Sequence, residues 1–183
     1  MTLGGCAPMH DIALSPGEAQ QPAPSAAPEE TAAQQALVDA IAARLIAGEE
    51  VAAYKAANHL AISDPAREAE VVAAAAASAA EHGVDEDLAR GVVTDQIAAS
   101  KIVQEGFQRL WAAGAPAPAS PSLDRARGVI SSATATIVTE LAAGPICPTP
   151  AALARLSDEL QRLGLDRKDS DSAAQRATAS LCA

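Results

Sequence analysis

The stretch Glu86–Ala113, EDLARGVVTDQIAASKIVQEGFQRLWAA, decides the fold class. Its larger apolar side chains follow a helical period. They are Leu88, Val92, Ile97, Val103, Phe107 and Leu110. Asp85 directly precedes the stretch and is a suitable N-cap residue, because its carboxylate can accept a hydrogen bond from a free backbone N–H. We therefore predict one long helix here.

The other patterned segments of the chain have the same period. Thr31 with Gln34 forms a capping-box pattern, and Asp64 followed by Pro65 is a strong helix start. Gly48 is expected to end the first helix. The predicted helices cover residues 31–48, 51–58, 64–83, 86–113, 122–143, 149–164 and 166–182. The sequence thus predicts an all-α fold, a single-chain bundle of about six helices.

Composition agrees with a single helical domain and excludes several partners. The 183 residues include 49% hydrophobic side chains but only three aromatic ones, which argues against a sheet protein. The net charge is −10, so nucleic acid and anionic membrane surfaces are poor partners for the whole molecule. A local basic pocket could still bind a small anion. No run approaches about 18 apolar residues without a charge, so no membrane span is predicted.

Residues 1–30 differ in composition from residues 31–183, which we take as the folded domain. They contain several prolines among Ala, Gln, Ser and Glu, without an apolar period, and are predicted to be a flexible, disordered leader. Within them, Leu3-Gly4-Gly5-Cys6 looks like the lipobox of bacterial lipoproteins, which would make Cys6 the site of a lipid anchor. Only two residues precede this short motif. Either the true start lies upstream or the match is chance.

Four polar side chains, those of Arg44, Arg67, Ser100 and Gln104, lie where an amphipathic helix would not place them. Arg44 falls on the apolar stripe of the first helix, and Ser100 and Gln104 follow one another on the inward face of the long helix. Buried polar groups need partners, so they form a network or bind a ligand. Arg67 opposes the dipole at its helix start, and a bound anion would remove that conflict. Glu68 could pair with Arg67 or accept a substrate hydroxyl. Taken singly, these positions also have purely structural explanations: Arg44 as a snorkelling arginine, Gln104 as an internally satisfied amide and Arg67 as an exposed side chain.

Cys147 and Cys182 bracket the last third of the chain. A bridge between them would close a loop of roughly 36 residues and would indicate an oxidising compartment. Two buried free thiols are the alternative. No metal site is predicted, because the histidines lack ligand spacing; they are His10, His59 and His82.

Taken together, these stretches resemble the all-helical chorismate mutases, and residues 31–183 look like their secreted subclass. The resemblance rests on Leu37-Val38-Asp39 with Ala43-Arg44-Leu45, Val51-Ala52-Ala53-Tyr54-Lys55, Asp64-Pro65-Ala66-Arg67-Glu68, and Asp95-Gln96-Ile97 with Ser100 and Gln104. The secreted subclass also has a disulfide at the positions of Cys147 and Cys182. The resemblance implies an isomerase that needs no cofactor and rearranges chorismate to prephenate, in a secreted or periplasmic protein that is commonly a homodimer.

The resemblance implies a role for each of four binding residues. Arg44 and Arg67 would bind the two carboxylates of chorismate. Ser100 would contact a carboxylate, and Glu68 would hold the ring hydroxyl. These roles require the four side chains to lie around one cavity.

Two further residues would act on the reacting bond. Lys55 would contact the ether oxygen and a neighbouring carboxylate, and Gln104 would donate a hydrogen bond to the same oxygen. The chain departs from the subclass where a third cation is expected, because Thr136 stands there. Arg127, earlier on the same predicted helix, is the candidate substitute. Two alternatives to a mutase remain: an isochorismate pyruvate-lyase on the same bundle, and a non-catalytic exported helical lipoprotein or mutase-like effector.

Overall fold

Helices form all the regular secondary structure in the part of the chain that the structure, a computed structural model, describes: residues 30–144 and 146–182. The elements are α1 (Ala32–Ala57), α2 (Pro65–Glu81), α3 (Glu86–Ala112), α4 (Leu123–Leu141), α5 (Pro150–Arg162), α6 (Arg167–Ala177) and the short 3₁₀ helix η1 (Ala179–Leu181). The prediction of an all-α bundle of about six helices is confirmed. The proposed leader and Cys6 lie outside the described residues, except for Glu30.

Each of the six α-helices begins at a residue whose side chain accepts a hydrogen bond from a backbone N–H of the first turn. These N-caps are Thr31, Asp64, Asp85, Ser122, Thr149 and Asp166. Losing such a cap typically costs about 1 kcal/mol. Short-range sequence chemistry therefore explains where the helices begin.

The predicted break at Gly48 is wrong, because α1 continues through it to Ala57 and includes the segment expected to form a separate helix. Gly48 is buried where α1 passes close to α3. A Cβ added there would lie 3.1 Å from Val103 Cγ1 and 3.5 Å from Ser100 Oγ. The glycine permits this close approach. Since Arg44 and Lys55 are eleven residues apart on one continuous helix, about three turns, they project from the same face.

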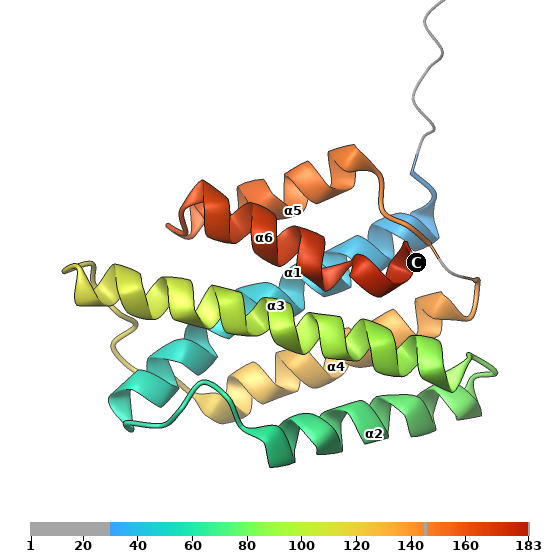
Figure 1. Cartoon of the computed structure of the whole chain (residues 1–183), viewed down its shortest axis with the longest axis horizontal. Helices are drawn as coiled ribbons and strands as arrows, with labels where there is room; N and C mark the ends of the chain where they lie inside the picture. The colour runs from blue at the N-terminus through green and yellow to red at the C-terminus, as the bar shows by residue number, and fades with distance from the viewer. Residues whose placement is uncertain (1–29, 145, 183) are drawn as a thin grey trace, which may run out of the picture.

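α3 is the central element of the bundle (Figure 1). It packs against α1, α2 and α6, while α4 packs along α1 and also contacts α2 and α3. Figure 1 shows α5 and α6 on one side of α3 and α2 on the other. Thus α1, α3 and α4 contact one another, and α2 contacts α3 and α4.

The hydrophobic core joins α1, α3 and α4 and extends to the C-terminal helices. Leu37, Ile41 and Leu45 of α1 and Phe107 of α3 are at most 1% exposed. Phe107 stacks on Trp111 with the ring centroids 5.6 Å apart. Alanine side chains fill much of the remaining core. None of the described helices is both long and apolar enough to span a membrane.

The C-terminal segment is fastened to the bundle by covalent and polar contacts. Cys147 and Cys182 are joined in a disulfide, with Cα atoms 4.7 Å apart, which confirms the predicted pair. The buried Asp95 of α3 accepts hydrogen bonds from the backbone N–H and hydroxyl of Ser180, at 2.7 and 2.6 Å, and its other oxygen lies 3.1 Å from Arg176. These contacts hold α6 and η1 against α3.

Candidate active site

A cavity of about 640 Å³ lies between α1, α2, α3 and α4 and the loop that joins α1 to α2. All six site residues predicted from the sequence line it: Arg44, Lys55, Arg67, Glu68, Ser100 and Gln104. They come from three helices and span 61 positions of the chain, yet the fold brings them to one space. This shared placement is what the resemblance required of them.

Arg44 lies in the wall between α1 and α4 and is only 4% exposed. Its Nη1 donates to Thr134 Oγ1 and, at 3.4 Å, to the Ile130 carbonyl oxygen. Its Nε is buried and has no hydrogen-bond partner within the described residues. Burial lowers the pKa of Arg44 to about 10, so the guanidinium is still charged at neutral pH. A buried charged donor with a free N–H is well suited to an anionic ligand.

Lys55 lies near the end of α1, half-buried, with its Nζ donating to the Ile62 carbonyl oxygen. This bond ties the ammonium group to the α1–α2 loop. Burial lowers the pKa of Lys55, and the positive charges of Lys101 and Arg127 add to that effect, while carboxylates, including that of Glu68, oppose it. Lys55 therefore has both carboxylates and other cations around it in the wall of the cavity.

Ser100 and Gln104 lie one turn apart on α3. Gln104 is 5% exposed, and its Nε2 donates to Ser100 Oγ at 3.1 Å. Its Oε1 is buried and has no hydrogen-bond partner in the part of the chain that the structure describes. A hydroxyl can either donate or accept, so turning the amide over would preserve the contact with Ser100 and leave Nε2 as the unpaired atom instead. In either orientation one amide atom of Gln104 remains available to a ligand.

Arg67 and Glu68 lie in the first turn of α2, which Asp64 caps. Arg67 is half-exposed, and its Nη1 lies 2.9 Å from Glu70 Oε2. Glu68 Oε1 accepts from the Asp64 backbone N–H at 3.0 Å, and Glu68 Oε2 lies 2.7 Å from Lys101 Nζ. Arg67 therefore reaches the cavity from its outer edge, whereas Glu68 is held in its wall.

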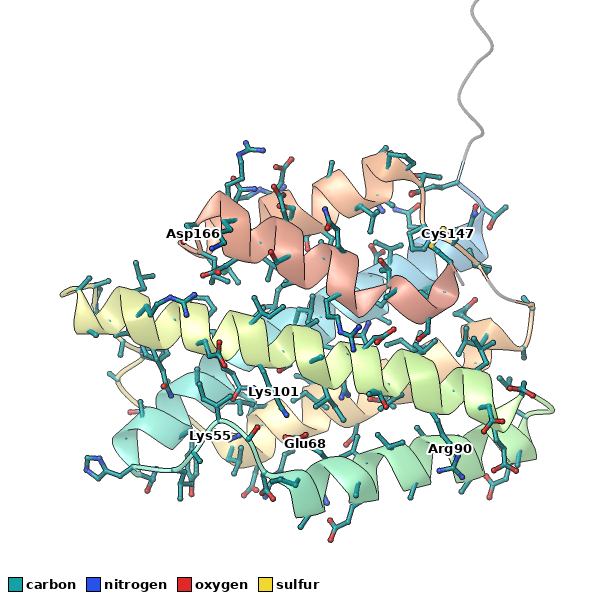
Figure 2. The ribbon with its side chains drawn as sticks, viewed as in Figure 1. Lys55, Glu68, Arg90, Lys101, Cys147 and Asp166 are labelled. Atoms are coloured by element: carbon teal, nitrogen blue, oxygen red, sulfur yellow. A yellow bond between two sulfur atoms is a disulfide. The ribbon has the colours of Figure 1, made fainter. Side chains whose placement is uncertain are left out.

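The sequence reasoning missed Lys101. It follows Ser100 on α3 and lies one turn after Ile97, which also lines the cavity. That i,i+4 spacing from an inward-facing residue was the available signal. Figure 2 shows Lys55, Glu68 and Lys101 close together between α1, α2 and α3.

The candidate for the third cation, Arg127, lines the cavity from α4. Thr136 does not. It borders a separate shallow groove between α1 and α4, and its hydroxyl donates to the Ser132 carbonyl oxygen at 3.2 Å. Arg127 is half-exposed, and its nearest acidic partner, Asp124, is 4.0 Å away. The guanidinium of Arg127 is thus only weakly engaged.

The net charge of the cavity lining is opposite in sign to the net charge of the whole chain. Its lining contains five cationic side chains and three carboxylates: Arg44, Lys55, Arg67, Lys101 and Arg127, against Asp64, Glu68 and Glu70. The excess of two positive charges is found in a protein with a net charge of −10. Among the described residues, no cluster of His, Cys, Asp or Glu could hold a metal ion. The cavity therefore suits a small molecule with two negative charges.

Comparisons with known proteins agree with this site. The family model described as chorismate mutase type II matches residues 31–105. A secreted chorismate mutase from Mycolicibacterium smegmatis is 38% identical over 109 residues, which are 58% of this chain and 60% of the relative. The chain thus aligns with less than two thirds of that curated relative's length.

Solved structures match over a larger share of the chain. The crystal structure of chorismate mutase from Burkholderia phymatum has a TM-score of 0.67 and 30% identity, and the match covers 84% of this chain and 99% of that one. The secreted chorismate mutase from Yersinia pestis has a TM-score of 0.64 and 26% identity, and the match covers 80% and 94%. Fold and site together define an all-helical protein with a cationic ligand cavity. The chain belongs to the chorismate mutase family, whose members are isomerases.

Proposed function

We propose that residues 31–183 rearrange chorismate to prephenate. The observation that carries this proposal is the cavity with an excess of two positive charges, in which Arg44 Nε and an amide atom of Gln104 are buried and find no partner among residues 30–144 and 146–182. Chorismate is a small dianion, so it would use both the charge and the free polar atoms. Family membership supports the same reaction.

The proposed reaction needs no covalent intermediate and no proton transfer. The ether C–O bond breaks as a new C–C bond forms, and negative charge grows on the ether oxygen. Lys55 and Gln104 donate to that oxygen and so favour the transition state over the bound substrate. A rate gain of about 10⁶ requires about 8 kcal/mol of such differential stabilisation.

The remaining cavity residues fold and orient the substrate. Arg44 and Arg67 bind its two carboxylates, Ser100 contacts a carboxylate, and Glu68 accepts the ring hydroxyl. The location of Arg44 deep in the wall and of Arg67 at the outer edge supports binding of two separated carboxylates. Holding the compact, chair-like geometry lowers the entropic part of the barrier.

Arg127 is the third cation in this proposal. Its side chain lines the cavity, and its weak contact with Asp124 leaves it free to turn to a substrate carboxylate. It replaces the cation that Thr136 cannot supply.

We also propose an exported protein that acts as a homodimer, with a lipid anchor at Cys6. The Cys147–Cys182 disulfide suits an oxidising compartment. Two of the similar proteins are named as secreted. The anchor is supported by the Leu3-Gly4-Gly5-Cys6 stretch, and mass spectrometry of the protein from its native membrane fraction tests it. Sedimentation equilibrium tests the dimer.

The decisive experiment follows the loss of chorismate absorbance with purified protein. The wild type should consume chorismate and form prephenate. Lys55→Ala should lower kcat by at least about 10²-fold, because it removes the charged donor to the ether oxygen. Lys168→Ala, an exposed cation on α6 away from the cavity, is the matched control and should be unaffected.

Three results would count against the mutase. Wild-type protein that leaves chorismate untouched would support a non-catalytic lipoprotein. Pyruvate released from isochorismate, without prephenate from chorismate, would support the lyase. Normal turnover by Lys55→Ala would remove the role given to Lys55.

A further inference from the structure

Lys101 and Glu68 form an ion pair that joins α3 to α2 at the wall of the cavity. Lys101 Nζ lies 2.7 Å from Glu68 Oε2, and the two side chains are 28% and 26% exposed. Among the described residues, the other ion pair between two charged side chains of the cavity lining is Arg67–Glu70, which is much more exposed, at 51% and 66%, and lies within one helix. The Lys101–Glu68 pair therefore stands out by its burial and by connecting two walls of the cavity.

Glu68 presents a problem for a cavity that binds a dianion. Burial would raise the pKa of Glu68, but hydrogen bonds from Lys101 and from the Asp64 backbone, with the charges of Lys101 and Lys55, lower it below its usual value. Glu68 is therefore ionised at neutral pH. An uncompensated carboxylate in the wall would repel a substrate carboxylate and reduce affinity.

Lys101 supplies the compensation. Glu68 Oε1 has one donor in the Asp64 N–H, and Oε2 has one in Lys101 Nζ. A carboxylate has about four acceptor positions, so it can still accept a substrate hydroxyl after both bonds are made. Lys101 thus cancels the charge of Glu68 and fixes its orientation without using up its capacity to accept.

We infer that Lys101 is a positioning and specificity residue, which neutralises and orients Glu68 so that the cavity accepts a dianion beside that carboxylate. The inference rests on the proposed chorismate mutase function. Lys101 acts on substrate affinity through Glu68, whereas Lys55 acts on the reacting bond itself.

If the ion pair only braced α2 against α3, the loss of Lys101 would have a different effect. A partly exposed salt bridge typically contributes little to stability, about 0–1 kcal/mol. Losing a mere brace would change the melting temperature slightly and leave substrate affinity alone. Losing a charge-compensating residue would raise KM with little change in kcat.

The test is a double-mutant cycle with chorismate as substrate and prephenate as the binding probe. We expect Lys101→Met to raise KM, and the Kd of prephenate by calorimetry, by at least about tenfold, with kcat changed less than about threefold. Lys101→Arg should restore affinity, because it keeps the charge. In a Glu68→Gln background the same Lys101→Met change should cost less than about twofold, because no charge is left to compensate.

Arg90→Met is the matched control. Arg90 is also a cation on α3 paired with a glutamate, Glu86, at 3.4 Å, but it does not line the cavity, and Figure 2 shows it apart from Lys55, Glu68 and Lys101. This variant should keep the wild-type KM. The control thus separates the loss of any α3 cation from the loss of Lys101.

The inference is overturned if Lys101→Met leaves KM and the prephenate Kd unchanged, which would make the pair a brace. It is also overturned if Lys101→Met costs the same factor with Gln at position 68, which would mean that Lys101 binds the substrate itself. Failure of the proposed function is recognised separately, because the wild type would then not convert chorismate.

Discussion

At the scale of single residues, Gln104 makes the cavity's donor independent of pH. An amide donates at any pH, whereas a carboxyl group donates only when protonated. The charged groups around Gln104 also each keep a single protonation state near neutral pH. The pKa of Glu68 is lowered, and that of Arg44, about 10, is well above 8. None of Gln104, Glu68 and Arg44 therefore has to change its protonation state between about pH 5 and 8.

We accordingly expect kcat/KM of the wild type to stay flat between about pH 5 and 8, because this parameter reports the titrating groups of the free enzyme. Gln104→Glu should lose activity as pH rises through the pKa of the new carboxyl, by at least about tenfold across the same range. Above pH 8 the wild type should decline before the usual lysine pKa of about 10.4, since that of Lys55 is lowered and catalysis needs its charged form. A steep wild-type fall above pH 6 would contradict the role of Gln104.

The sequence located the site well but incompletely. Arg44, Ser100 and Gln104 were recognisable because polar groups on an inward helix face are rare, and the cavity contains all three. Lys101 was missed because a lysine on a helix is usually solvated. The role proposed for Lys101 depends on its contact with Glu68, 33 residues away, and no local sequence pattern reveals that contact.

At the scale of elements, the helix starts were predictable and one helix end was not. Asp64-Pro65 and Asp85 act on N–H groups within their own first turn, so the signal is local. Gly48 gives a local stop signal, but the tight contact with α3 overrides it. Whether Gly48 ends α1 or lets another helix pack closely is decided by α3, more than 50 residues further along the chain.

Two matched substitutions test this explanation of Gly48. Gly128 lies on α4 with nothing within 4 Å of an added Cβ, so Gly128→Ala should raise the free energy of unfolding by about 0.5–1 kcal/mol. Gly48→Ala gains the same helix propensity but forces a methyl group against the buried Val103, and overpacking costs about 1–3 kcal/mol. It should therefore be less stable than the wild type. Urea denaturation of both variants measures the difference, and a stabilising Gly48→Ala would contradict the close-packing role.

At the scale of the whole molecule, the cavity and the disulfide occupy different parts of the chain. Every residue that lines the cavity precedes position 139, whereas the disulfide closes the loop from Cys147 to Cys182. α5 and α6 pack on the far side of α3 from α2 (Figure 1). The C-terminal third thus supports the bundle without forming the site.

Removing the disulfide should therefore reduce stability more than activity. With a sequence separation of 35 between the cysteines, the Cys147→Ser, Cys182→Ser double variant should lose about 3–4 kcal/mol. Its melting temperature should fall by roughly 10 °C. At temperatures where it is folded, kcat/KM should stay within about twofold of the wild type. Calorimetry and the chorismate assay measure these, and an intact mass unchanged by reduction and alkylation would show that no bond exists.

The fold class followed from periodicity because helices bury an apolar face at regular intervals. Which helices pack together did not follow from periodicity, because the contacts of α4 with α1 and of α6 with α3 join segments that are far apart in the sequence. The disulfide was predictable as a pair because two cysteines bracket the C-terminal third.

One polypeptide supplies every wall of the cavity, from α1 through α4. If the proposed dimer forms, each copy would therefore have a full set of cavity residues of its own, and an intact subunit would need no side chain from a damaged neighbour. In a mixture of intact and inactive copies, output would simply follow the intact fraction, as expected for an enzyme whose copies work without cooperation.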